Sequence, residues 1–213
     1  MTFEESIAHF MKEIQAENDG KSIDFIIPGY ASKQFEGYMS MLQDLTLCID
    51  ALHYFSEEKC PTVVSASIYY TVIILYGKCF TDSSDNKYPK LEVKDCFGED
   101  VPHLEKIHEK LMLLRHNFAA HRGSTLNEFL FPYLNIALGT FEAHVRIKQE
   151  KRLKPTKEEL SEYLEIIVHL IEVVKEKLDK AGQKLYKHMV TNYSNGLLAN
   201  WKIAGPYEPD KLN

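Results

Sequence analysis

Apolar residues recur every three or four positions in most of the long segments of this chain, and this spacing constrains the fold more than any other feature. Because an α-helix turns once in about 3.6 residues, such spacing places the apolar side chains on one face of a helix. Helices that each have one apolar face are stable when those faces pack together. The pattern therefore predicts an all-α fold, a helical bundle, with helices over 2–18, 36–58, 61–81, 103–122 and 156–193.

The segment 61–81 differs from the other predicted helices because it is apolar on nearly all sides. Pro61 suits the first position of a helix. The stretch from Cys60 to Gly77 has 18 residues without a charge, which is close to the about 20 that a transmembrane helix needs. Serine, threonine and three tyrosine side chains lie within it, and its amphipathic neighbours require a buried partner. We therefore interpret it as the central helix of the bundle and expect no membrane span.

Between the fourth and fifth predicted helices the spacing changes from helical to alternating. Ala143, Val145 and Ile147 alternate with charged or polar residues, which is the pattern of a β-strand with two different faces. Gly139-Thr140 separates this run from an earlier one that is rich in Phe, Tyr, Leu and Ile. We expect a small inserted β-hairpin over 129–148 with its turn at Gly139, and a loop-like tail over 195–213.

Length and composition are those of one ordinary globular domain, which we place over 1–213. The chain has 213 residues, of which 45% are hydrophobic and 26% charged. Its net charge of −6 excludes a protein that coats nucleic acid by bulk positive charge. The four cysteines form no metal-binding or redox pair, and the first residues do not resemble a secretory signal. We expect a cytoplasmic protein with no metal and no other cofactor.

Reactive side chains are densest at the end of the fourth predicted helix. There the sequence reads Leu-Leu-Arg-His-Asn-Phe-Ala-Ala-His-Arg-Gly. It contains Arg115, His116, Asn117, His121 and Arg122.

This segment resembles the HEPN family, whose members are all-helical and carry the motif Arg-x(4–6)-His. Arg115 and His121 match the motif with five residues between them, and His116 stands where the family commonly has Asn, Asp or His. The Ala120-His121-Arg122 ending is similar to abortive-infection members. The order of long helices around the motif is also similar, whereas the hairpin and the tail fall outside the resemblance.

The resemblance implies a metal-independent endoribonuclease that acts at a homodimer interface. Such a protein is often the toxin of a toxin–antitoxin or phage-defence system, so an antitoxin or a nucleotidyltransferase is a candidate partner. Arg115 and His121 would be the catalytic pair, with His116 and Asn117 auxiliary. The chemistry suits these residues, because histidine exchanges a proton near neutral pH and the arginine fork matches phosphate oxygens. The first can assist attack of a ribose 2′-OH on the neighbouring phosphate, and the second can stabilise the charge that develops there.

Helix geometry complicates this pairing. Six residues of a straight α-helix span about 9 Å and leave Arg115 and His121 about 120° apart. They converge only if the arginine reaches across, if the last turn is distorted, or if a second copy supplies its own motif. The helix dipole favours a protonated His121, which suits a general acid. A structural role stays open, because Arg and His also cap the carbonyls of a helix end.

A second cluster bears on the substrate. Between residues 145 and 157 six basic residues accompany one glutamate, a local charge of +5. Arg146, Lys148, Lys151, Arg152 and Lys154, together with Arg122, are our candidates for contact with an RNA backbone, with Tyr133 and His144 nearby as stacking groups. A solvated lysine-rich linker explains the same pattern. The alternative function is a catalytically silent HEPN-like module that binds a partner protein or a nucleotide.

Overall fold

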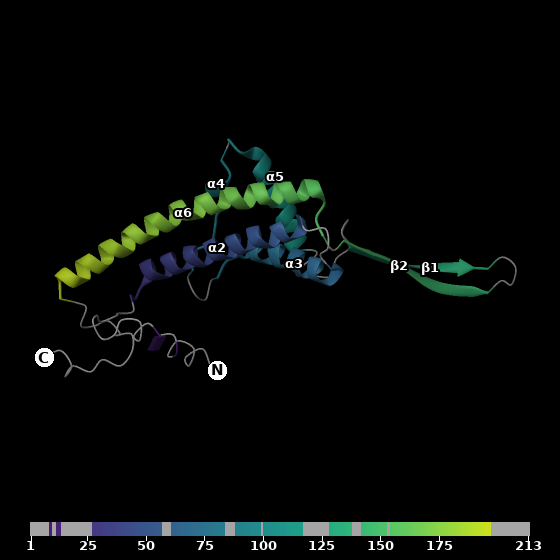
Figure 1. The fold of residues 1–213 in the computed structure, drawn as a ribbon, viewed down its shortest axis with the longest axis horizontal. Coiled ribbons are helices and arrows are strands. Elements are labelled where there is room, and N and C mark those ends of the chain that lie inside the picture. Colours follow the sequence, from purple (N-terminus) through teal and green to yellow (C-terminus); the bar gives the residue numbers. More distant parts are fainter. Residues whose placement is uncertain are drawn as a thin grey trace. The chain divides into compact units, whose positions relative to one another are not determined.

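A computed structural model describes residues 9, 12–13, 27–56, 61–83, 88–98, 100–116, 128–137, 142–152 and 154–196. The chain divides into two compact units, one formed by 1–36 with 179–213 and the other by 37–178. The described residues are mostly helical and include one two-stranded sheet (Figure 1). This confirms the expected helical bundle with an inserted hairpin. A single domain over 1–213 stays a prediction.

The long helices lie close to their predicted bounds, except that the helix predicted over 103–122 ends at Leu114, with residues 117–122 outside the described part of the chain. They are α2 (Tyr30–His53, continued by the short η1, Tyr54–Ser56), α3 (Thr62–Lys78), α5 (Pro102–Leu114) and α6 (Lys157–Ser194). The helix predicted over 36–58 begins earlier, directly after Gly29, whose φ of 99° no regular helix accepts. The helix predicted over 2–18 lies outside the described residues except at 9, 12 and 13, which are helical, and most of the tail over 195–213 also lies outside them.

The start of α6 shows how local sequence fixes a helix end. The Oγ1 atom of Thr156 accepts a hydrogen bond from the Glu159 amide at 3.2 Å, and the Glu159 carboxylate accepts one from the Thr156 amide at 2.9 Å. This reciprocal pair is a capping box, which satisfies amides that have no partner within the helix. It sets the point at which the chain leaves the hairpin and becomes helical.

The core of the 37–178 unit is formed by side chains of α2, α3, α5 and α6. In α3 the buried positions include Tyr69, Val72 and Tyr76. The helix that we interpreted as the central one is not covered on all sides, however, because Val63 is 77% exposed and Ile74 48%. Among the described residues, each helix is either too short or too polar to cross a membrane.

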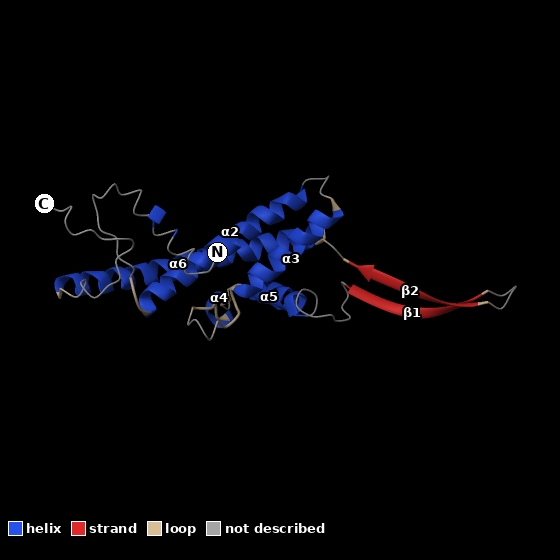
Figure 2. Cartoon of the chain, turned by 90° about the horizontal axis from the view of Figure 1, so that it is seen from below, coloured by secondary structure: helices blue, strands red, loops and turns tan. Residues whose placement is uncertain are grey.

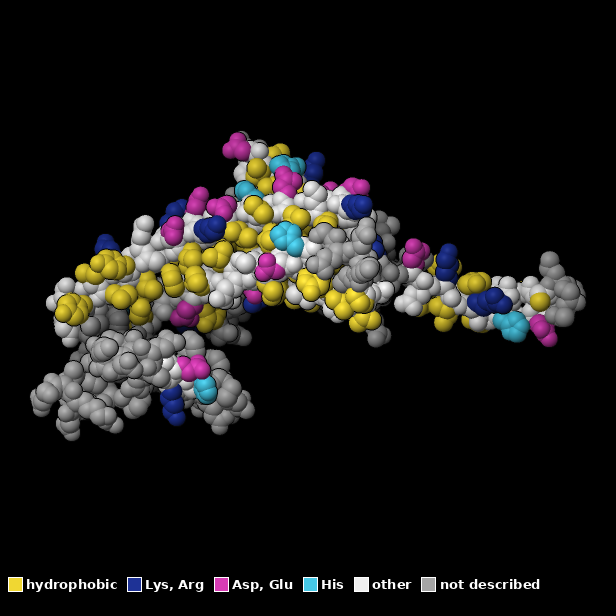
Figure 3. Space-filling view, viewed as in Figure 1, with side chains coloured by type: hydrophobic (Ala, Val, Ile, Leu, Met, Phe, Trp, Pro, Cys, Tyr) yellow, Lys and Arg dark blue, Asp and Glu magenta, His cyan; other side chains and the backbone are white. Residues whose placement is uncertain are grey.

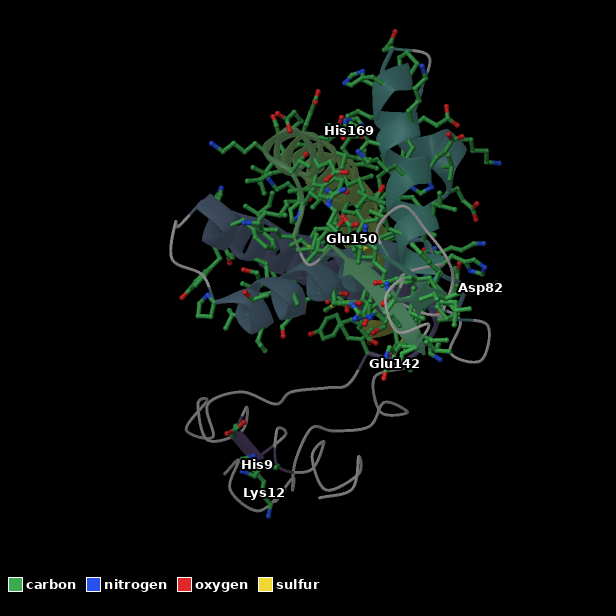
Figure 4. All side chains as sticks on the ribbon, turned by 90° about the vertical axis from the view of Figure 1, so that its right-hand side faces the viewer. His9, Lys12, Asp82, Glu142, Glu150 and His169 are labelled. Atoms are coloured by element: carbon green, nitrogen blue, oxygen red, sulfur yellow. The ribbon has the colours of Figure 1, made fainter. Side chains whose placement is uncertain are left out.

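The connection between α3 and α5 contributes more to the core than its polar composition predicts. It contains a short helix, α4 (Val93–Cys96), and buries Leu91, Cys96 and Phe97. His169 of α6 donates a hydrogen bond to the Cys96 carbonyl at 2.7 Å, and Figure 4 labels His169 among the side chains of the unit. A few apolar residues within a polar segment are therefore enough to fix this connection against the helices.

The hairpin consists of two antiparallel strands, β1 (Glu128–Ile136) and β2 (Ala143–Lys151), which Figure 2 shows in red. Phe131 pairs with Lys148 and Ile136 with Ala143. The paired positions are symmetric about the Gly139–Thr140 bond, where the sequence predicts the turn. Residues 138–141 lie outside the described part of the chain.

Candidate functional site

Arg115 directly follows the last residue of α5, and its side chain packs on α3. A Cβ atom placed on Gly77 would lie 1.9 Å from the Arg115 Cδ atom and 2.7 Å from its Nε atom. The arginine therefore occupies the space in which any other residue at position 77 would have its side chain. Gly77 lies in the last turn of α3, whose partial negative charge favours a nearby cation.

Arg115 as a whole is half-buried. Among the described residues, no carboxylate or carbonyl accepts a hydrogen bond or forms an ion pair with it. Leu111 and Leu114, on the same helix, are buried, so the backbone before the arginine is anchored in the core. The result is a cation whose stem is held by packing and whose charged end faces no anion from the described residues.

The helix changes at this position. Residues 115 and 116 form the start of a π-helical turn, whereas the Arg115 amide itself still bonds to the carbonyls of Leu111 and Met112, four and three residues before it. Such widened turns occur often at functional sites. The straight-helix geometry that separates Arg115 from His121 by about 120° therefore does not extend past Leu114 in the described chain.

The other motif residues are only partly described. His116 is exposed. Asn117, His121 and Arg122 lie outside the described residues, so the meeting of Arg115 with His121 stays a prediction.

The hairpin sorts its side chains onto two faces. Directly paired residues of antiparallel strands point to the same side, and successive residues of one strand point to opposite sides. One side, the aromatic–basic face, is made up of Phe131, Tyr133, Asn135, His144, Arg146 and Lys148, and it ends at the pair of Phe129 with the exposed Glu150. The other side, the aliphatic face, is made up of Leu130, Pro132, Leu134, Ile136, Ala143, Val145, Ile147 and Gln149.

Side chains of both faces are solvent-exposed or half-exposed, and Figure 3 shows hydrophobic, basic and histidine side chains together along the hairpin. An isolated two-stranded hairpin is at best marginally stable in water. The two faces differ in chemistry, and neither is covered by the described residues.

The predicted RNA-binding residues separate into two groups. Arg146 and Lys148 are exposed on the aromatic–basic face, and Lys154 is exposed after the hairpin. Arg152 instead forms an ion pair with the carboxylate of Glu159 and donates a hydrogen bond to the Lys154 carbonyl at 3.0 Å. Its charge is used within the protein. The side chain of Lys151 lies outside the described part.

Glu159 is the centre of this internal network. Its side chain is 10% exposed, and it accepts from Lys110 at 3.0 Å as well as from Arg152 and the Thr156 amide. A carboxylate this buried is stable only when it is paired and hydrogen-bonded. The network therefore fixes the chain between β2 and α6.

His108 lies on α5, two turns before Arg115, and its role is structural. His108 is buried, and its Nδ1 atom lies 2.9 Å from the Tyr76 hydroxyl, with the rings of Phe80 and Phe97 against it. Burial lowers the pKa of His108 below its ordinary 6.5, while nearby Glu109 opposes that shift. A neutral imidazole accepting from a tyrosine hydroxyl fits a core hydrogen bond.

Metal-binding side chains and cysteine thiols are the two other groups in this chain that could carry chemistry. Among the described residues, no three His, Cys, Asp or Glu side chains come together in a way that would hold a metal ion. Three thiols are buried, and burial raises the pKa of Cys48 and Cys79 to about 12 and that of Cys96 to about 11. Thiols in this state are poor nucleophiles, so we treat them as core residues.

Two features of this site were not found from the sequence. Gly77 shows no local signal, because only its contact with Arg115 gives it a role. The two faces of the hairpin could have been found from the predicted turn at Gly139, since the turn position fixes the register and hence the side on which each residue lies.

No family model, curated protein or solved structure matches this chain.

Proposed function

We propose that this chain is a metal-independent endoribonuclease of the HEPN type that acts as a homodimer, the toxin of a toxin–antitoxin or phage-defence system. The observation that carries the proposal is the state of Arg115. Its stem packs against Gly77, the residue is half-buried, and no protein anion among the described residues pairs with its guanidinium. A cation held in this way is suited to a phosphate supplied by a ligand.

In the proposed reaction a ribose 2′-OH gives up its proton to a water molecule as its oxygen attacks the neighbouring phosphorus. The bond to the 5′ oxygen breaks, which leaves a 2′,3′-cyclic phosphate on one product and a 5′-OH on the other. Arg115 stabilises the charge on the pentavalent phosphate. His121 donates a proton to the departing 5′ oxygen, and His116 and Asn117 orient the substrate or the motif of the second copy. A well-aimed donor contributes about 10²–10³ in rate, and general acid catalysis about 10²–10⁴.

The test is cleavage of total RNA by the purified protein in the presence of EDTA. Arg115→Ala should lower the rate about 10²–10³-fold, and Arg115→Lys, which keeps the charge but loses the planar fork, should recover only part of it. His121→Ala should lower the rate comparably. His188→Ala, at an exposed histidine of α6, is the matched control and should leave cleavage unchanged.

Circular dichroism and the oligomeric state show whether each variant is folded. Intact RNA after incubation with a folded dimer of the unmodified chain would contradict the nuclease proposal. That result would instead favour the catalytically silent module, which binds a partner protein or a nucleotide.

A further inference from the structure

We propose that the aromatic–basic face of the hairpin binds single-stranded RNA, with bases stacked on Phe131 and Tyr133 and phosphates held by Arg146 and Lys148. The choice of RNA over DNA rests on the proposed function. The binding surface itself rests on the register, exposure and charge of the hairpin.

The first argument is the exposure of the two rings. Phe131 is 46% exposed and Tyr133 41%, and they are two residues apart on one face of β1. Their centroids are 6.4 Å apart and their planes are tilted by 53°, so the two rings are not stacked on each other. At these exposures each ring presents surface on which a base can stack. Base–aromatic stacking of this kind is the usual basis of sequence-tolerant binding to single strands.

The second argument is the position of the cations. Lys148 is paired directly across the strands from Phe131, and Arg146 from Tyr133. Among the described residues, neither cation has a carboxylate within ion-pair distance. His144 lies 3.9 Å from Glu142, so we assign it no phosphate. Each ring thus has a cation beside it, which matches the alternation of base and phosphate along a nucleic-acid strand.

The third argument is the contrast with the other side of the hairpin. The aliphatic face has no charged residue between 130 and 136 or at the positions of β2 that share its side from 143 to 149, and its one charged pair, Glu128 with Lys151, stands at the end of the strands away from the turn. A polyanion therefore has one face to contact. A duplex does not fit that face as well, because its bases are paired and cannot stack on exposed rings.

The experiment measures fluorescence anisotropy of a labelled single-stranded RNA with the full chain, carrying His121→Ala in every sample so that the RNA stays intact. The same sequence as DNA, and as an RNA duplex, are the comparison probes. Phe131→Leu and Tyr133→Leu keep apolar area but remove the ring, and Tyr133→Trp restores one. The matched control is Leu134→Thr with Val145→Thr, which changes the aliphatic face of the same hairpin.

Each ring-to-leucine change should weaken binding about 5- to 150-fold, and Tyr133→Trp should bind as the unmodified ring does. Arg146→Gln with Lys148→Gln should reduce the salt dependence, the slope of log affinity against log salt, by about 1.4, as expected for two phosphates on a single strand. The aliphatic-face control should bind unchanged, and RNA should bind more tightly than DNA or duplex.

The proposal is overturned if the leucine variants bind normally, if the aliphatic-face control loses as much affinity, or if the duplex or the DNA binds as tightly as the single-stranded RNA. Polyglutamate that displaces the RNA from unmodified and leucine variants alike would identify an acidic-protein surface instead. Failure here is distinct from failure of the nuclease proposal. Arg115-dependent cleavage with normal binding by the leucine variants would leave the nuclease standing, and ring-dependent binding without cleavage would leave this inference standing.

Discussion

Replacing Gly77 by alanine tests whether the site depends on the close contact with Arg115. The new methyl group would lie 1.9 Å from the Arg115 Cδ atom and 3.0 Å from its Cγ atom, so the arginine must leave its present position. Overpacking of this kind costs about 1–3 kcal/mol. Alanine in place of glycine within a helix returns about 0.5–1 kcal/mol. The free energy of unfolding of the variant should therefore be lower than that of the unmodified chain by about 0–2.5 kcal/mol.

A double-mutant cycle separates these two effects. In an Arg115→Ala background the clash is absent, so Gly77→Ala should stabilise the protein by about 0.5–1 kcal/mol. The difference between the two backgrounds, measured by urea unfolding, should be about 1–3 kcal/mol. In the cleavage assay Gly77→Ala alone should lose nearly as much activity as Arg115→Ala, because the guanidinium is displaced.

Gly182→Ala is the matched control for this cycle. A Cβ atom there would meet only the Phe35 ring, at 3.5 Å, which is an ordinary contact. It should stabilise α6 by a similar amount whether or not Arg115 is present. If Gly77→Ala destabilises the protein equally in both backgrounds, the glycine is needed for another reason and the reasoning is refuted.

Three further predictions concern stability and reactivity. Glu159→Gln should lower the free energy of unfolding by about 3 kcal/mol, because it leaves Arg152 and Lys110 without their shared anion. Glu162→Gln is the control: it changes an exposed ion pair with Lys110 and should cost no more than about 0.5–1 kcal/mol in the same urea titration. The folded pKa of His108 is below 6.5, so the stability that its neutral form contributes is complete above pH 6.5 and is lost as the pH falls below 6.5. The melting temperature should therefore decline between pH 7 and 5, and His108→Phe should flatten that decline. An unchanged slope in this variant would contradict the buried neutral imidazole. In a Cys60→Ser background the three remaining thiols should react with a thiol reagent at pH 8 only after denaturant is added, and fast reaction in the native protein would show that they are not buried as described.

The helices could be predicted from the sequence because their stability comes from periodic apolar faces and local caps. Leu45, Leu52 and Leu111 are wholly buried, as the three- and four-residue spacing predicts. The capping box of Thr156 and Glu159 is a local pattern and needs no knowledge of the rest of the fold.

The rest depends on contacts between distant segments, which spacing does not contain. Burial of Leu91 and Phe97 depends on how the 79–101 connection meets the helices. The pairing of Arg152 with Glu159 takes one predicted RNA contact out of the basic strip, and nothing in the linear charge pattern distinguishes Arg152 from Arg146. The seat of Arg115 on Gly77 joins residues 38 positions apart on two helices.

The exposure of the hairpin has a consequence for how such a protein can diverge. None of the described side chains on its two strands is buried, so these side chains are not part of the packed interior of the bundle. Replacements there are free of the volume constraints that govern Leu111 or Tyr76. Selection can therefore alter what the insertion recognises while the scaffold that carries Arg115 keeps its stability, and the two properties can evolve at separate rates.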